Sequence, residues 1–375
     1  MKIKKTTIWL GGLFLSLSML TGCGGSNAHD GKTGLIASGG SNTDTGSALQ
    51  SIQKNILIAD SNDLVTKLSS MEQLLNSYEQ NLTQTDVGKL QNSFKDILKA
   101  WKAVHTLYIA GKYDNLLLDT PRFIEFFVKA SKRQDIPAEV QDALNSSSTI
   151  ENALFKNTSK SMQALEFLIF DIQKNASDIV ALMNKDERRR IAALKIVNAN
   201  LKKHASVIAD FYLSQTDFVS DTTKALNSLV NQLRQSAFDL REKRIGEPAG
   251  LVAKTKDNPD PSTLAYYNSK SSLFAAKAIL EAHRNMMGTS SSGNFGTFAA
   301  TNGASQIVTN IRASIDASLS IIAELDLLEE AITTTGVDPK VEILYAEIQK
   351  LENIYTQSLI ESLNLTATLI DADGD

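Results

Sequence analysis

Apolar residues recur at steps of three and four positions along most of the chain from Ile52 onward. The run with the fewest slips contains Leu90, Phe94, Ile97, Trp101, Val104 and Tyr108. This spacing places the side chains on one face of an amphipathic helix. Further helical runs cover 158–172, 186–213, 216–243, 261–287, 302–333 and 339–369. Because no segment offers a convincing series of alternating strands, the pattern predicts an all-α protein.

Prolines and glycines divide this helical pattern into segments. A proline is tolerated in a break or at a helix start, and that is where we place Pro121, Pro137, Pro248, Pro259, Pro261 and Pro339. The best internal boundary is the Gly/Pro-rich stretch 246–250 with the loop that follows it. We therefore expect two packed helical bundles in series, an N-terminal bundle at 51–245 and a C-terminal bundle at 246–375.

Residues 1–22 have the three-part pattern of a secretory signal peptide. Lysines precede an apolar stretch at 8–20, and small residues then lead to Cys23. An ordinary membrane-spanning helix is the alternative, but it needs roughly 20 apolar residues. We therefore expect cleavage before Cys23 and attachment of lipid to its thiol, as in bacterial lipoproteins.

The segment 23–50 is rich in Gly, Ser, Thr, Asn and Asp. With few large apolar side chains it cannot bury enough surface to fold, so we interpret it as a flexible tether. Gly24 follows the cysteine at a position where an Asp would resemble the usual inner-membrane retention signal. In a cell with two membranes, this favours anchoring to the outer membrane, facing the periplasm.

The charge balance and the cysteine content argue against several classes of function. The chain has 38 Lys and Arg against 42 Asp and Glu, so it carries no electrostatic footprint for nucleic acid. Cys23 is the single cysteine, and its lipidation leaves no thiol for a disulfide, a zinc site or catalysis. The sequence also has no paired-histidine metal spacing, no glycine-rich phosphate loop after a strand and no nucleophile elbow.

The most unusual local sequence surrounds Glu166. This carboxylate lies among large apolar residues, with Gln163 one helical turn before it on the same face. Burying a carboxylate costs free energy unless it is paired, hydrogen-bonded, metal-bound or protonated. Spacing alone favours a structural carboxylate bonded to a donor on another helix, and a binding site is the alternative.

The histidines offer weaker candidates. His105 lies one turn after Trp101 on an apolar stripe, which favours core packing over a ligand role. The turn that follows can present Asp119 and Arg122. We expect His204 to be solvated on a lysine-rich face, and His283 to lie at a helix end, where the dipole favours a cation.

The chain ends in three aspartates within five residues, Asp371, Asp373 and Asp375. This spacing is like the start of a calcium loop, but the downstream Glu of such a loop is missing. A solvated acidic tail is the simpler interpretation.

Four segments together resemble the imelysin-like family. The first is Ala100-Trp101 with its helix and the turn at 119–122; the second is 163–170, which is similar to the family's motif segment. The third is Tyr267-Asn268-Ser269-Lys270, opening a long helix, and the fourth is the terminal Asp-Gly-Asp. They span most of the mature chain in the expected order.

The resemblance implies an all-α body of two bundles with a cleft between them, in an exported and often lipid-anchored protein tied to iron uptake. Some members are described as metallopeptidases with a Gly-x-His-x-x-Glu motif. Here the Gly position is Ser161, the His position Gln163 and the Glu position Glu166. Glutamine cannot supply an imidazole nitrogen, so the usual zinc site is not expected, whereas a hard-cation site or a small-ligand site that uses oxygens is compatible with these residues.

We expect a non-catalytic envelope lipoprotein linked to iron or metal acquisition, with a divalent or ferric ion as its cofactor and envelope iron-uptake proteins as partners. By resemblance, Glu166, Gln163, His105, Asp119 and Arg122 would form its ligand or metal site. A metallopeptidase with Glu166 at the metal is the first alternative. A helical module that docks a partner protein is the second.

Overall fold

A computed structural model describes residues 42–78, 81–126, 135–185, 188–288 and 294–368. The signal peptide, Cys23 and the terminal aspartates lie outside these residues. The long helices are α2 (Ala59–Asn76), α3 (Gln84–Thr106), α9 (Arg189–Ser214), α11 (Thr222–Asp239), α13 (Ser272–Met287), α15 (Ser305–Ala323) and α17 (Pro339–Asn353). The all-α fold class is confirmed. No helix of the described segments is long and apolar enough to cross a membrane.

Shorter elements connect and extend the long helices. The short α-helices are α1 (Asn42–Ile52), α4 (Thr120–Ile124), α5 (Ile136–Asn145), α6 (Ile150–Ala153), α7 (Met162–Ile169), α8 (Ala176–Asn184), α10 (Asp217–Ser220), α12 (Glu247–Ala249), α14 (Phe295–Ala299), α16 (Leu328–Ala331) and α18 (Ile360–Ser362). Single 3₁₀ turns are η2 (Ala110–Lys112), η3 (Asn115–Leu117), η4 (Thr158–Lys160) and η7 (Pro261–Thr263). The predicted helical run at 302–333 is interrupted after α15 ends at Ala323. A two-stranded antiparallel hairpin, β1 (Ile332–Thr333) with β2 (Gly336–Val337), begins at its last two residues.

In the described residues, three stretches of π-helix widen the helices: η1 (Gln53–Ile58), η6 (Leu240–Gly246) and η9 (Ile354–Leu359). The segment η8 (Ala300–Ala304) is a kink between α14 and α15, because Asn302 and Gly303 have non-helical backbone angles. A π-turn shifts the side chains that follow it around the helix axis. In η6 this places three basic residues, Arg241, Lys243 and Arg244, on different sides of one helix. Arg241 bonds Glu352, Lys243 lines a pocket and Arg244 enters the protein interior.

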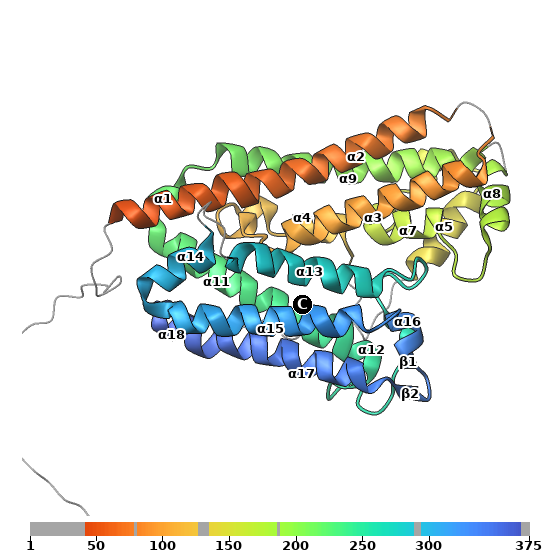
Figure 1. The fold of residues 1–375 in the computed structure, drawn as a ribbon. Coiled ribbons are helices and arrows are strands. Elements are labelled where there is room, and N and C mark those ends of the chain that lie inside the picture. The colour runs from red at the N-terminus through yellow and green to blue at the C-terminus, as the bar shows by residue number, and fades with distance from the viewer. Residues whose placement is uncertain (1–41, 79–80, 127–134, 186–187, 289–293, 369–375) are drawn as a thin grey trace, which may run out of the picture. The chain divides into compact units, whose positions relative to one another are not determined.

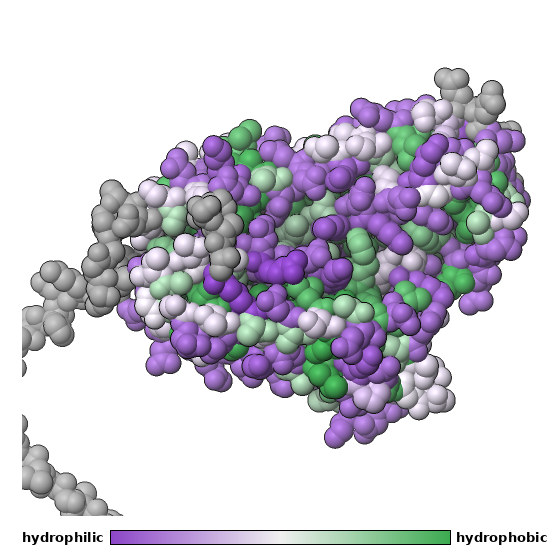
Figure 2. Space-filling view, in the orientation of Figure 1, coloured by the Kyte–Doolittle hydropathy of each residue, from purple (hydrophilic) through white to green (hydrophobic). Residues whose placement is uncertain are grey.

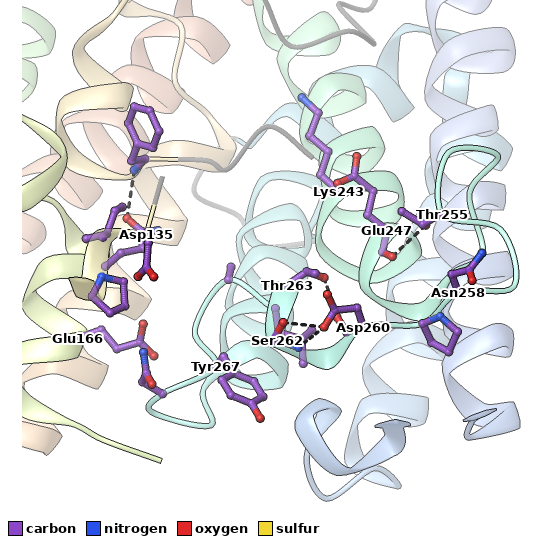
Figure 3. Close-up of a pocket in the computed structure, with 18 of the residues that line it drawn as sticks. Asp135, Glu166, Lys243, Glu247, Thr255, Asn258, Asp260, Ser262, Thr263 and Tyr267 are labelled. Carbon is purple, nitrogen blue, oxygen red and sulfur yellow. Dashed lines mark hydrogen bonds between the residues drawn. The ribbon is translucent and has the colours of Figure 1, made fainter. Parts of the chain in front are cut away.

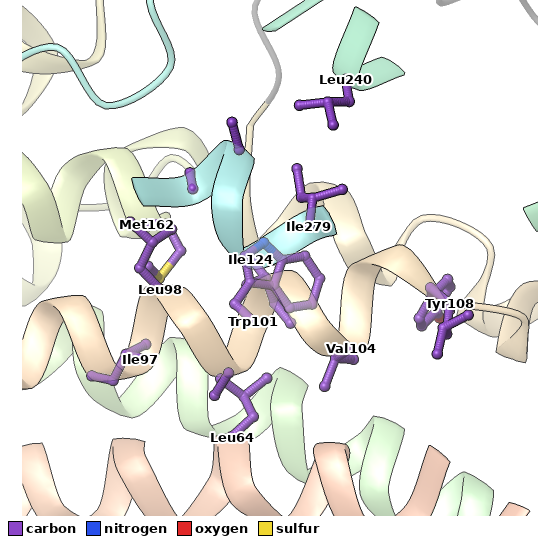
Figure 4. Close-up of a cluster of buried hydrophobic side chains, with 14 of the residues drawn as sticks. Leu64, Ile97, Leu98, Trp101, Val104, Tyr108, Ile124, Met162, Leu240 and Ile279 are labelled. Atoms are coloured by element: carbon purple, nitrogen blue, oxygen red, sulfur yellow. The ribbon is translucent and has the colours of Figure 1, made fainter. Parts of the chain in front are cut away.

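The long helices pack side by side in a continuous order. Helix α2 packs on α9 and α3, α3 packs on α13, and α13 packs on α15, which in turn packs on α17. One hydrophobic core runs through these helices; Figure 4 shows Leu64, Trp101 and Ile279 meeting from α2, α3 and α13. Hydrophilic residues cover most of the face in Figure 2, as amphipathic helices require. The boundary between bundles at residue 246 stays a prediction.

Helix α3 shows how the sequence pattern produces this packing. Thr83 and Asp86 form a capping box at its start, and Phe94 and Trp101 are fully buried along its apolar face. The helix ends at Thr106, two residues before the predicted stripe does. Tyr108 lies beyond the end, and its hydroxyl donates to the Leu117 carbonyl.

Two expected helix starts are corrected by the structure. Helix α1 begins at Asn42, so the last residues of the predicted 23–50 tether are helical; Leu49 and Ile52 are fully buried and give that helix an apolar face. The predicted helical run at 261–287 begins as α13 only at Ser272. A loop precedes it because Lys270 adopts a left-handed φ of 50°, which an α-helix cannot include.

Gly296 in α14 marks a backbone contact that a side chain would disrupt. An added Cβ would clash with the Met287 carbonyl oxygen at the end of α13. We expect Gly296→Ala to lower the free energy of unfolding by about 1–3 kcal/mol, because backbone must move to admit the methyl group. Gly88→Ala is the control, since nothing lies within 4 Å of its added Cβ. Equal urea-unfolding midpoints for the two variants would contradict the packing described here.

Candidate functional site

A pocket of about 890 Å³ opens beside α7. One wall comes from α7 and the start of α5, and the opposite wall comes from η6, α12 and the segment 254–268. Figure 3 shows Glu166 and Asp135 on one side, with Lys243 and Glu247 on the other. The lining mixes aromatic, aliphatic and hydrogen-bonding groups: Phe126, Asp135, Ile136, Pro137, Gln163, Glu166, Lys243, Glu247, Lys254, Thr255, Asn258, Pro259, Asp260, Ser262, Thr263, Leu264, Ala265, Tyr267 and Asn268.

Glu166 lies in this pocket wall with only 3% of its surface exposed, as its apolar flanks predicted. Its Oε1 accepts one hydrogen bond from the Ser269 backbone N–H at 2.8 Å and a second from the Ser269 hydroxyl at 2.8 Å. Burial raises the pKa of the Glu166 carboxyl to about 8, although the bonds from Ser269 oppose the shift. The partners are neutral donors from a distant loop.

Gln163 lines the same pocket one turn earlier in α7. Its Oε1 accepts a hydrogen bond from the Phe126 backbone N–H at 3.1 Å. Ser161, at the Gly position of the motif, is the N-cap of α7, and its hydroxyl accepts from the Ala164 N–H. The three motif positions therefore hold the helix and its neighbouring segments together.

A buried charge cluster lies behind the pocket around Glu125, at the C-cap of α4. The Glu125 carboxylate accepts from Lys102 Nζ at 2.6 Å, Trp101 Nε1 at 2.7 Å, Arg244 Nη2 at 3.1 Å and the Tyr266 hydroxyl at 2.7 Å. Burial opposes ionisation, but Arg244 and Lys102 hold the pKa of Glu125 well below its usual range. The carboxylate is therefore ionised and joins segments far apart in the sequence.

This cluster was not predicted from the sequence, although a signal for it is present. Glu125 stands between Ile124 and Phe126, an acid among apolar residues, which is the same pattern that drew attention to Glu166. Lys102 follows Trp101 on a helix already predicted to be amphipathic. The pairing between them depends on tertiary packing and could not be read from spacing.

His105 lies on α3 beside this cluster and does not line the pocket. Its ring stacks on Trp101 with the ring centroids 5.1 Å apart. Burial lowers the pKa of His105 to about 3, so the imidazole is neutral. The ring is partly buried and packs against Trp101.

Asp119 and Arg122 also lie away from the pocket lining. Asp119 Oδ1 and Arg122 Nη1 are 3.4 Å apart, and both side chains are more than half exposed. They occupy the start of α4, whose other end leads to Glu125. Of the residues predicted for the site, the structure brings Gln163 and Glu166 together at the pocket.

The two remaining described histidines differ from their expectations. His283 is fully buried, not placed as a cation; its Nδ1 lies 3.1 Å from the Tyr355 hydroxyl and its Nε2 lies 3.2 Å from the Ser236 hydroxyl. Burial lowers its pKa to about 3. His204 is half-buried and stacks on Phe123. His204 packs against Phe123 and His283 packs against Tyr355. Neither aromatic neighbour is close in the sequence, so these contacts could not be predicted from the residues around each histidine.

The donor set does not fit a resident zinc of the peptidase type. Such a metal needs three protein ligands and an open position. In the part of the chain that the structure describes, no three His, Cys, Asp or Glu side chains are grouped to hold a metal ion. Oε1 of Glu166 has its two lone pairs directed to Ser269, and the Gln163 carbonyl is bonded to Phe126.

The sequence matches the Imelysin family model, a peptidase family, over residues 57–355. The chain belongs to the imelysin family. Among curated proteins, no match to the chain is found. The resemblance drawn from the Trp101 helix and the Glu166 segment is thereby confirmed, while the role of each residue in the imelysin motif stays open.

Two solved structures share the fold. An imelysin-like protein from Psychrobacter arcticum 273-4 aligns with a TM-score of 0.57 at 13% identity, covering 89% of this chain and 100% of its own. A protein assigned as an iron-regulated protein A precursor, from Parabacteroides distasonis ATCC 8503, aligns with a TM-score of 0.68 at 8% identity, covering 87% of this chain and 96% of its own. At these identities the likeness shows the fold.

The buried cluster gives a stability prediction. Glu125→Gln removes the negative charge that faces Lys102 and Arg244, so we expect the free energy of unfolding to fall by about 3–5 kcal/mol. The matched control is Asp119→Asn in an exposed ion pair, which should cost less than about 1 kcal/mol. Urea unfolding followed by circular dichroism measures both, and similar losses in the two variants would contradict the role given to Glu125.

Glu166 gives a prediction for pH. Its pKa is about 8 in the folded protein against 4.5 as the ordinary value, so folding favours the protonated form. The stability it contributes is present below pH 4.5 and is lost as the pH rises through 8. From pH 5 to 8, wild type should lose stability relative to Glu166→Gln, by at most about 1.4 kcal/mol for each pH unit. A constant difference between their thermal midpoints over this range would contradict the prediction.

Proposed function

We propose that this imelysin-family protein is a non-catalytic, lipid-anchored binding component of the cell envelope that serves iron or metal acquisition. The observation that carries the proposal is the state of the two motif residues in the pocket. Gln163 offers no imidazole, its side-chain oxygen is bonded to Phe126, and Oε1 of Glu166 is bonded to Ser269. Residues engaged in this way support a binding surface better than they support a hydrolytic metal centre.

The size and lining of the pocket support a molecule larger than a bare ion. Small-molecule sites commonly have volumes of about 300–1,000 Å³, and this pocket lies in that range. Its wall mixes apolar groups such as Phe126 and Pro259 with polar groups such as Asn268 and Asp135. Such a wall suits a polar organic ligand, including one that carries a chelated metal.

The link to iron rests on the family and on one fold neighbour. The Parabacteroides distasonis protein is assigned as an iron-regulated protein A precursor, and it shares the fold of this chain over most of its length. The signal-peptide pattern ending at Cys23 supports export and lipid attachment. Envelope iron-uptake proteins are the partners that this placement suggests.

The metallopeptidase is the second candidate, favoured by the peptidase name of the family model. It requires chelator-sensitive hydrolysis that depends on Glu166. A helical docking module is the third candidate, and it requires a partner protein bound independently of the pocket.

Accumulation of radioactive iron under iron limitation tests the proposal. Cells deleted for the gene should accumulate less iron than wild-type cells, and the wild-type copy should restore uptake. A copy with Ala265→Trp, which fills the pocket wall, should fail to restore it. A copy with Ile343→Trp, at an exposed position on α17, is the matched control and should restore it. Equal iron content in all strains, or chelator-sensitive proteolysis lost in Glu166→Ala, would overturn the proposal.

The anchor has its own test. In Cys23→Ser the thiol that takes the lipid is absent, so we expect an uncleaved precursor that incorporates no labelled palmitate. Wild type should be shortened and labelled. Cleavage before residue 23 together with labelling of the variant would contradict the lipoprotein assignment.

A further inference from the structure

The loop that leads into α13 is held by carboxylates at both of its serines. Glu166 Oε1 accepts from the Ser269 N–H and hydroxyl, each at 2.8 Å. Glu329, from α16, repeats the arrangement: its Oε1 accepts from the Ser272 N–H at 3.2 Å and from the Ser272 hydroxyl at 2.6 Å. In both cases one carboxyl oxygen receives the backbone and side-chain donors of one serine. We call residues 266–272 the entry loop.

A third carboxylate fixes the start of the entry loop. The hydroxyl of fully buried Tyr266 donates to Glu125 Oε1 at 2.7 Å. Three acids from separate elements therefore hold seven consecutive residues. Glu329 also caps the N-terminus of α13, where no capping side chain comes from Ser271 and a carboxylate is favoured by the helix dipole.

The entry loop supplies part of the pocket wall. Tyr267 and Asn268 lie between two of the anchored residues, and both line the pocket. Figure 3 shows Tyr267 on this loop, in the wall formed by the segment 254–268. The position of these two side chains thus depends on the bonds made by their neighbours.

The chemistry of the Glu166 contacts distinguishes a positioning role from a metal-binding role. Both lone pairs of Oε1 are directed to neutral donors, so an amide oxygen can make the same two bonds. A carboxylate that binds a metal ion cannot be replaced in this way, because the amide lacks the negative charge. The variant Glu166→Gln therefore distinguishes a positioning residue from a metal ligand.

We propose that Glu166 is a positioning residue that fixes Ser269, and through it the Tyr267–Asn268 wall of the pocket, and that it is not a metal ligand. The inference rests on the proposed function insofar as the pocket binds a ligand. The order of the entry loop is measurable without any ligand, so failure of iron uptake and failure of this inference are distinguishable.

Hydrogen exchange of the mature protein, resolved to the amides of the entry loop, tests the proposal. In wild type the Ser269 amide should be protected. Glu166→Ala should speed its exchange by about tenfold or more, whereas Glu166→Gln should stay within about threefold of wild type. Glu324→Gln, in an exposed ion pair with Lys340 outside the entry loop, is the matched control and should leave the Ser269 amide unchanged. If Glu166→Ala does not fold, Ser269→Ala serves instead: it removes the hydroxyl donor and should speed exchange at Tyr267 and Asn268.

Titration with zinc, manganese or ferrous ion alone supplies the second readout. No binding, or binding that Glu166→Gln retains, supports the positioning role. Stoichiometric metal binding by wild type that Glu166→Gln abolishes would overturn it. Exchange of the Ser269 amide in Glu166→Gln as fast as in Glu166→Ala would overturn it as well, as would an unprotected Ser269 amide in wild type or an unchanged loop in Ser269→Ala.

Discussion

The buried carboxylate of Glu125 is the constraint on which the arrangement of the other elements depends. An ionised carboxylate in the interior is costly unless donors surround it. Here the donors come from Trp101 and Lys102 on α3, from Arg244 on η6 and from Tyr266 in the entry loop. Because these segments are far apart in the sequence, satisfying one charge fixes α4, α3, η6 and the entry loop relative to each other.

The pocket follows from that constraint. The residue after Glu125 is Phe126, whose N–H bonds Gln163 and so joins α4 to α7. The residue after Tyr266 is Tyr267, which lines the pocket, and Ser269, three positions after Tyr266, bonds Glu166. Both walls of the pocket are thus continuous with the buried cluster. The pocket is thus lined by segments that polar contacts hold in place, and the motif residues Gln163 and Glu166 make two of these contacts.

The sequence predicted the features that depend on local periodicity. The face of α3 that contains Phe94 and Trp101 is buried as its spacing indicated, and Glu166 is buried as its apolar flanks indicated. Contacts between distant segments could not be predicted this way. The partners of Glu125, the neutral state of His283 and the start of α13 at Ser272 each depend on which helices become neighbours. A single sequence contains no direct record of that choice.

The most direct test of the central claim is a crystal structure of the mature protein grown with ferrous or zinc ion, with anomalous data collected at the metal edge. The claim is that the Gln163 side-chain oxygen and Oε1 of Glu166 bond the protein itself, and that the pocket serves a larger ligand. The account predicts no anomalous peak at bonding distance from Glu166, with both hydrogen bonds from Ser269 intact. A metal ion bonded to Glu166, with Ser269 displaced from its carboxylate, would contradict it.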